Sequence, residues 1–142
     1  MFSRPVYAAE TWTMKAADES KIRAFEMSVL RRICGVSLRD KWRNDDIKAL
    51  LGIENDVVEK IQRRRLSYFG HVSRMKSDRV PLRMLNGRIH GNRPRGRPRR
   101  NWLDAVEEDC RERHITLLQA CRLTEDRGQW QKMVFGPPRR ST

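Results

Sequence analysis

Apolar residues recur at helical spacing early in the chain, with polar residues filling the positions between them. From Ile22 onward they fall three, four, one and three residues apart, which places them on one stripe of a helix. The residues of this stripe are Ile22, Phe25, Val29, Leu30 and Ile33. Gly35 follows directly and is a typical end for such a helix. The pattern therefore predicts a helix that ends before Gly35 and buries this stripe.

A short helix is predicted next. Asn44 is a candidate N-cap, and Asp45 and Asp46 suit the positive end of a helix dipole. Gly52 is the expected stop. The apolar residues between these signals are Ile47, Leu50 and Leu51.

A longer helix is predicted after Asn55 or Asp56, either of which can cap it. Its broad apolar face comprises Val58, Ile61, Leu66, Phe69, Val72 and Met75, with Lys60, Arg63 and Arg74 on the other face. Arg65 falls inside the apolar arc, so we expect it to have a partner or to lie at the edge of the core. Gly70 disfavours the helix by about 1 kcal/mol relative to alanine. Tyr68, Phe69 and Trp102 could stack on nucleobases, but their helical spacing favours a core role.

Three shorter helices are predicted in the last part of the chain. Asn101 can cap the first of them, which carries Trp102, Leu103, Val106 and Cys110. Another contains Ile115, Leu117, Leu118 and Cys121, and the last spans residues 125–135 with Trp130, Met133 and Val134. Gly136 is the expected stop.

The predicted fold class is mainly α: one or more small helical domains with a flexible arm rich in Arg, Pro and Gly. Residues 1–14 are expected to be an irregular lead-in, with Trp12 as the apolar anchor of a short extended piece, and residues 15–80 a helical region. Residues 81–100 are the basic linker arm, residues 101–136 a C-terminal helical region, and residues 137–142 a tail.

The charge balance indicates a polyanionic partner. The 142 residues carry 31 Lys and Arg against 18 Asp and Glu, a formal net charge of +13. Such an excess repels itself unless it is neutralised, and nucleic acid does so with release of condensed counterions. A membrane surface is the rival partner, but no apolar run of about 18 residues predicts a membrane span. Residues 1–10 do not resemble a signal peptide, and three widely spaced cysteines fit free thiols in the nucleus or cytoplasm better than secretion.

Residues 88–100 contain six arginines and no acidic residue. Within them, Pro94-Arg95-Gly96-Arg97-Pro98 resembles the core of an AT-hook, in which prolines extend the backbone and glycine lets it approach a narrow minor groove. Non-specific phosphate contact and an ordinary solvated linker are the alternatives. The residues expected to contact nucleic acid are Arg63, Arg64, Arg65, Arg74, Arg88, Arg93, Arg95, Gly96, Arg97, Arg99 and Arg100. An ordinary solvated helix face is an equally good interpretation of the basic residues from Arg63 to Arg74.

Signals for catalysis are weak. Asp45-Asp46 is the only pair of adjacent aspartates, and a helix start explains it better than a metal site. Cys110, His114 and Cys121 supply three ligands and no C-x-x-C pair, which disfavours a zinc site. No glycine-rich phosphate loop ending in lysine occurs. We expect no catalytic residues, no metal and no cofactor.

An ordered set of short phrases resembles one family. The phrases are Glu10-Thr11-Trp12-Thr13, Ala24-Phe25-Glu26-Met27, Leu30-Arg31-Arg32-Ile33, Gly35-Val36-Ser37, Arg39-Asp40, Arg64-Arg65-Leu66, Gly70-His71-Val72, Arg74-Met75, Gly96-Arg97-Pro98, Trp102, Asp104-Ala105-Val106 and Asp109. In this order they resemble the C-terminal region of the endonuclease-reverse transcriptase of non-LTR retrotransposons, pieces of which are called craniofacial development protein-like in host genomes. The resemblance covers residues 10–135.

The resemblance implies a thumb and post-thumb region that holds RNA or DNA while other domains supply the chemistry. The apolar residues between Ala24 and Ile33 would then be helix core. The match begins close to Met1, which suggests a truncated copy. Two other interpretations remain open: an AT-hook-like chromatin protein that binds the DNA minor groove, and a non-functional relic of a decayed element.

Overall fold

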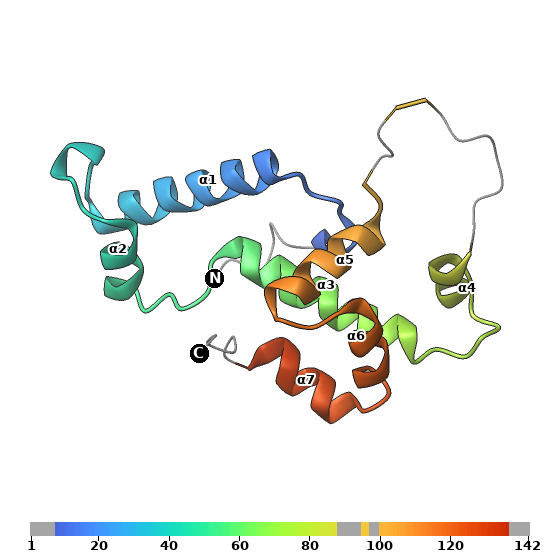
Figure 1. Cartoon of the computed structure of the whole chain (residues 1–142). Helices are drawn as coiled ribbons and strands as arrows, with labels where there is room; N and C mark the ends of the chain where they lie inside the picture. Colours follow the sequence, from blue (N-terminus) through green and yellow to red (C-terminus); the bar gives the residue numbers. More distant parts are fainter. Residues whose placement is uncertain (1–7, 88–94, 97–99, 137–142) are drawn as a thin grey trace. The chain divides into compact units, whose positions relative to one another are not determined.

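The computed structural model describes residues 8–87, 95–96 and 100–136, and this part of the chain is mainly α-helical, as the sequence predicts. Seven α-helices and two short 3-10 helices follow one another along these residues, without a strand between them (Figure 1). None of the described helices is long and apolar enough to cross a bilayer. Most of the predicted arm, residues 88–94 and 97–99, lies outside the described residues.

The chain divides into two compact units. Residues 14–61 form the described part of unit 1, whereas unit 2 combines residues 8–13 with the described residues from 62 onward. The boundary falls inside a continuous helix, α3 (Val57–Ser73). The predicted helical region 15–80 therefore contains parts of both units.

Unit 1 is built on α1 (Ala16–Cys34) and α2 (Asn44–Leu50). Gly35 ends α1 in the left-handed region at φ 66°, as predicted, and donates its amide to the carbonyls of Arg31 and Arg32. The core of this unit joins Met27 and Leu30 of α1 to Ile47 of α2.

The stripe expected to be buried on α1 is only partly buried. Met27, Leu30 and Cys34, spaced three and four residues apart, line the side of α1 that packs in the core of unit 1. Phe25 and Ile33 are instead 70% and 57% exposed. The apolar residues of α1 cover a wider arc than the side of the helix that packs against α2. Their spacing alone therefore did not show which part of this arc is buried.

The start of α2 lies one residue from its expected place. Arg43 is the N-cap, and the Asn44 side chain accepts a hydrogen bond from Arg31 of α1 at 2.7 Å. Asp45 and Asp46 occupy the first turn, as predicted, and Gly52 follows the helix at φ 62°.

The N-terminus of α3 is capped within unit 1. A carboxylate oxygen of Asp56 accepts the amide of Glu59 at 2.7 Å, the geometry of an N-cap. The Glu26 carboxylate of α1 accepts the amide of Val57 at 3.2 Å. Two amides of the first turn, which have no partner within the helix, are thereby satisfied.

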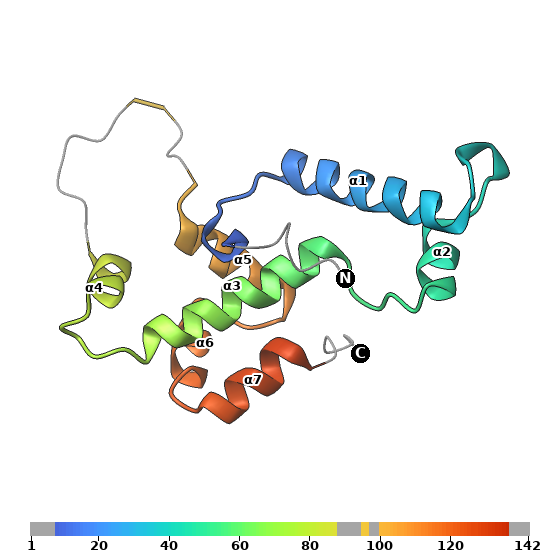
Figure 2. The same cartoon turned by 180° about the vertical axis from the view of Figure 1, so that it is seen from behind.

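Unit 2 packs three helices against α3: α5 (Trp102–Glu112), α6 (Leu117–Leu123) and α7 (Arg127–Phe135). Both views of the chain show them alongside α3 (Figures 1 and 2). The buried core consists of Leu66, Phe69, Val106, Cys110, Ala120, Trp130 and Val134. Each helix starts at a side chain that accepts amides of its first turn: Asn101, Thr116 and Asp126. Asn101 was the predicted cap.

Gly70 has a specific packing role in this core. A methyl group at Gly70 would lie 2.1 Å from Nε1 of the Trp130 indole, so no larger residue fits without movement. That Nε1 donates a hydrogen bond to the Leu66 carbonyl at 3.1 Å. The glycine that weakens the helix in isolation therefore admits the largest side chain of the core.

The predicted linker arm begins with a helix. Residues 80–86 form α4 (Val80–Asn86), with Pro81 in its first turn. The chain from Pro81 onward was expected to be a linker arm, but residues 81–86 are helical. A proline in the first turn has no amide partner to lose and its fixed φ suits a helix start.

The residues before α1 form a 3-10 helix, η1 (Ala9–Thr11), rather than an extended piece. The Trp102 indole donates to the Glu10 carbonyl at 2.7 Å, and Arg65 donates to the Trp12 carbonyl at 3.4 Å. The Trp12 side chain itself is 48% exposed, so it is not the apolar anchor of this segment, whereas Ala9 is fully buried.

Candidate nucleic-acid interface

Three consecutive arginines of α3 have three different environments. Arg64 is exposed, Arg63 is half-buried and Arg65 is 1% exposed. Successive residues of an α-helix point about 100° apart, so three in a row cannot share one face. Of the three, Arg64 is the best placed to meet a partner in solvent.

Arg65 forms an ion pair in the core of unit 2. Its Nε and Nη2 donate to the two carboxylate oxygens of Asp109 on α5, at 2.6 and 2.7 Å, and Asp109 is 3% exposed. This geometry matches the planar guanidinium to the carboxylate at two points. Arg65 was expected to be among the nucleic-acid contacts, a placement made from its neighbours Arg63 and Arg64. Its burial against Asp109 corrects that placement, and it confirms that an arginine inside the apolar arc needs a partner.

Arg74 lies just beyond the end of α3 and is exposed. One of its guanidinium nitrogens donates to the Thr124 carbonyl, which follows α6, at 2.8 Å. This bond fixes the side chain while the rest of the guanidinium remains at the surface.

The described part of the arm is short. Arg95 and Gly96 are exposed, and Gly96 has φ 103°, a conformation that glycine adopts readily. Arg100 forms an ion pair with Glu108 of α5. Arg88, Arg93, Arg97 and Arg99 lie outside the described residues.

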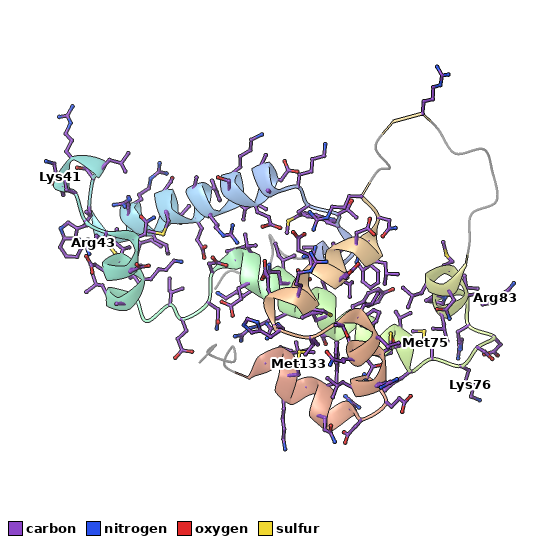
Figure 3. All side chains as sticks on the ribbon, in the orientation of Figure 1. Lys41, Arg43, Met75, Lys76, Arg83 and Met133 are labelled. Carbon is purple, nitrogen blue, oxygen red and sulfur yellow. The ribbon has the colours of Figure 1, made fainter. Side chains whose placement is uncertain are left out.

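Further basic side chains lie outside α3. Figure 3 shows Lys41 and Arg43 in the connection before α2 of unit 1. In unit 2 it shows Lys76 after α3 and Arg83 on α4. All four are exposed. Positive charge is thus present on the surface of each unit.

The solvent side of α3 in unit 2 carries a set of polar and aromatic residues that the sequence analysis did not bring together. Arg64, Ser67, Tyr68 and His71 are three or four residues apart, so they share one face. With Glu10 and Phe135 they line a hollow of about 350 Å³. Helical periodicity shows the α3 half of this set, but the approach of Phe135 depends on the tertiary fold.

The described residues offer no grouping of three His, Cys, Asp or Glu side chains that could hold a metal ion. Cys34, Cys110 and Cys121 are all free thiols. Burial raises the pKa of the Cys110 thiol to about 12, and the neighbouring Asp109 carboxylate acts in the same direction. Cys110 is therefore a protonated core residue and a poor nucleophile.

Tyr68, Phe69 and Trp102 pack mainly with one another and with the core. Phe69 is 1% exposed, and its ring lies 6.0 Å from that of Trp130. Tyr68 meets Trp102 edge to face at 5.8 Å. Of these rings, Tyr68 also lines the hollow on the solvent side of α3.

The chain is similar to a transposon-derived, uncharacterized protein of Caenorhabditis elegans. The two are 26% identical over 136 residues, a match that covers 90% of this chain and 48% of the relative. The chain thus spans about half the length of the curated relative that it matches. No protein-family model and no solved structure matches it. The similarity is consistent with a transposon-related origin.

Proposed function

We propose that this chain is a nucleic-acid-binding piece of a non-LTR retrotransposon reverse transcriptase, corresponding to its thumb and post-thumb region, and that it has no catalysis of its own. Its similarity to a transposon-derived protein supports the broader origin. The ordered phrases from Glu10 to Asp109 motivate the narrower assignment.

The observation that carries the proposal is the set of exposed basic residues of unit 2. Arg64 is exposed on α3, Arg74 and Lys76 are exposed after it, and Arg83 is exposed on α4. With a formal net charge of +13, the chain has an excess of cations that its own acidic residues do not balance. A phosphate polymer is the partner that neutralises such an excess over an extended surface.

The direct test is the salt dependence of binding to RNA and DNA. Fluorescence anisotropy with a labelled structured RNA and a labelled DNA duplex, each at two salt concentrations, gives the slope of log affinity against log salt. We expect affinity to fall as salt rises, because each phosphate contact releases counterions. Affinity that is independent of salt contradicts phosphate binding.

Single arginine variants locate the contacts. Arg64→Ala should lower the affinity and reduce the salt slope by roughly one contact, about 0.7 to 0.9 units. Arg39→Ala is the matched control, since it removes the same charge from an exposed site in unit 1. Equal effects of the two variants indicate dependence on net charge alone and contradict a specific face.

An AT-hook-like function is tested with the same assay. A preference for A·T-rich over G·C-rich duplex that disappears in Arg97→Ala favours minor-groove binding by the Arg-Gly-Arg motif. Equal affinity for the two duplexes excludes that function and leaves the phosphate-binding proposal intact.

Two further measurements separate the remaining alternatives. Circular dichroism of the purified chain should show the helical spectrum that the fold requires, whereas a flat spectrum favours a non-functional relic. Incubation with template, primer, nucleotides and magnesium should give no incorporation, and incorporation contradicts a non-catalytic role.

A further inference from the structure

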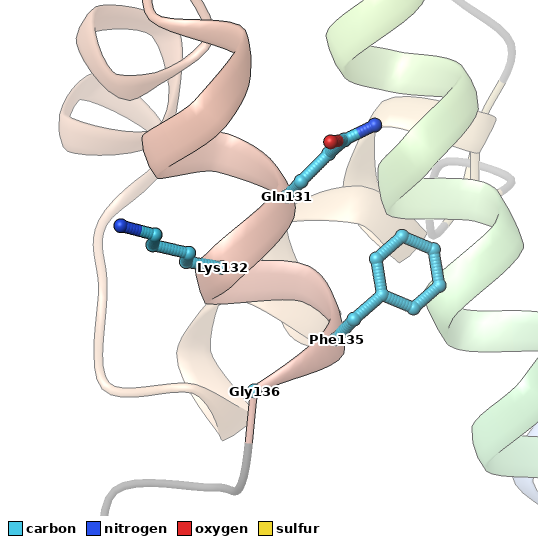
Figure 4. Close-up of a pocket in the computed structure, with 4 residues that line it drawn as sticks. All are labelled: Gln131, Lys132, Phe135 and Gly136. Carbon is cyan, nitrogen blue, oxygen red and sulfur yellow. The ribbon is translucent and has the colours of Figure 1, made fainter.

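The solvent side of unit 2 contains a hollow formed by three segments that are far apart in sequence. Arg64, Ser67, Tyr68 and His71 come from α3, Glu10 comes from η1, and Phe135 comes from the last turn of α7. A second hollow, lined by Gln131, Lys132, Phe135 and Gly136, adjoins it through the shared Phe135 (Figure 4). Phe135 is thus the residue that the two hollows share.

Phe135 is an aromatic residue that the core does not use. Its side chain is 53% exposed, and it is not part of the buried cluster that contains the neighbouring Val134. In Figure 4 the Phe135 ring and Gln131 project from α7 toward α3, while Lys132 points away from them. Helix α7 thus directs a half-exposed ring over the hollow, where the ring is accessible to a planar ligand.

Tyr68 adds a second ring whose position is fixed. It is half-buried, and its edge-to-face contact with Trp102 has ring centroids 5.8 Å apart and an interplanar angle of 79°. Trp102 is itself held by its hydrogen bond to the Glu10 carbonyl. The Tyr68 ring of the hollow is therefore preorganised, which lowers the entropic cost of binding a flat ligand against it.

The polar groups around these rings complement a nucleotide. Arg64 and His71 lie seven residues apart on one face of α3 and can approach phosphate or sugar oxygens. Ser67 offers a hydroxyl between them. The Glu10 carboxylate disfavours phosphate on its own side, but it can accept hydrogen bonds from the amino group of a nucleobase.

We propose that this hollow binds an unpaired nucleotide of single-stranded RNA or DNA. The base stacks against Phe135 and Tyr68, and Arg64 contacts the adjoining phosphate. The volume of about 350 Å³ falls at the lower end of the range for small-ligand sites, which suits one nucleotide. A paired duplex cannot enter, because its bases are already stacked and their edges are occupied. The inference rests on the proposed function and adds to it a preference for unpaired strands.

The test compares single strands with duplexes. Fluorescein-labelled RNA and DNA strands of about 12 nucleotides, within the usual size of single-strand sites, and the corresponding duplexes are titrated at fixed salt. Phe135→Ala should weaken single-strand binding roughly tenfold, within the 5- to 150-fold effect of losing one stacked base. Binding to duplex should not change, and Phe135→Trp should retain single-strand affinity. Comparing the RNA and DNA strands shows which of them the site prefers.

Phe25→Ala is the matched control. Phe25 is 70% exposed on α1 and belongs to unit 1, whereas the residues that line the hollow belong to unit 2. It should leave both affinities unchanged. Crosslinking of the unaltered chain to a strand carrying 4-thiouracil gives an independent readout, with Tyr68 and Phe135 as the expected sites.

The outcomes separate this inference from the proposed function. If Arg64→Ala weakens binding but Phe135→Ala does not, and the crosslinks map elsewhere, phosphate binding stands and the stacking site is overturned. An equal loss on single strands and duplexes in Phe135→Ala also overturns it. If the unaltered chain binds neither, the proposed function fails together with the site.

Discussion

Arg65 of α3 donates two hydrogen bonds to the carboxylate of Asp109 on α5, 44 residues further along the chain, and both side chains are buried. A buried guanidinium loses its hydration, and the Asp109 carboxylate offsets that loss only while the two-point geometry is kept. The pair therefore fixes the register of α5 against α3 rather than adding a large net stability.

Removing one partner of this pair should destabilise the fold strongly. Asp109→Ala leaves the guanidinium buried without its counter-charge, and we expect a loss of about 3–5 kcal/mol in the free energy of unfolding. Urea denaturation followed by circular dichroism measures it. The double variant Arg65→Met/Asp109→Leu should be more stable than Asp109→Ala alone. A double variant that is as unstable as the single one contradicts this account of the cost.

Gly70→Ala should destabilise unit 2, although alanine favours a helix more than glycine does. The added methyl group meets the Trp130 indole, and overpacking of this kind costs about 1–3 kcal/mol. Trp130→Leu also destabilises, but it makes room for the methyl group. The double variant Gly70→Ala/Trp130→Leu should therefore lose less than the sum of the two single changes in urea denaturation, and strict additivity contradicts the contact.

Protonation of the Asp126 carboxyl, the N-cap of α7, should lower the stability of the fold in acid. Hydrogen bonds from the backbone amides of Gln129 and Gly128 hold the pKa of its carboxyl below the ordinary 3.8. A lowered folded-state pKa means that this stabilisation is complete above the unfolded pKa and is lost as the pH falls through the folded pKa. Thermal unfolding followed from about pH 6 to pH 2 should show this loss beginning near pH 4. Asp126→Asn keeps the cap but does not titrate, so it should have a shallower acid dependence. Identical profiles for the two proteins contradict the assignment.

Two of the three cysteines, Cys121 and Cys110, should react with a thiol reagent in a definite order. Cys121 is exposed, whereas Cys110 is buried with a thiol pKa raised to about 12. At about pH 8, Cys121 should be alkylated in the folded chain and Cys110 only after unfolding in denaturant. Peptide mass spectrometry after iodoacetamide treatment measures both. Rapid alkylation of Cys110 in the folded chain contradicts its place in the core.

Local signals in the sequence located several helix ends. Gly35 and Asn101 act as stop and cap because their roles depend on backbone conformation and on side chains within three residues. Pro81 shows the limit of this reasoning, since a proline can begin an irregular segment or stand in the first turn of a helix. The flanking residues of α4 provide no side-chain cap that would have distinguished the two.

Contacts between helices could not be read from the sequence. The apolar arc of α3 showed that Arg65 needed a partner, but nothing in the pattern selected Asp109. The propensity penalty of Gly70 was visible, whereas its reason, the Trp130 indole, lies 60 residues away. On α1, the exposed Phe25 and the buried Met27 differ only in which side the rest of the unit covers. Of the residues that line the hollow on α3, Arg64 was among the expected contacts, whereas the approach of Phe135 depends on where α7 packs.

The hydrogen bonds that hold η1 and Trp12 have a consequence for the design of shorter fragments of this protein. The Glu10 carbonyl accepts its hydrogen bond from Trp102, 92 residues later, so unit 2 is complete only when η1 and α5 are both present. A recombinant fragment that begins at α1 lacks the backbone carbonyls of Glu10 and Trp12. The Trp102 indole N–H and one N–H of Arg65 then lose their hydrogen-bond acceptors. Expression plasmids for the C-terminal helices should therefore carry residues 8–13 as well.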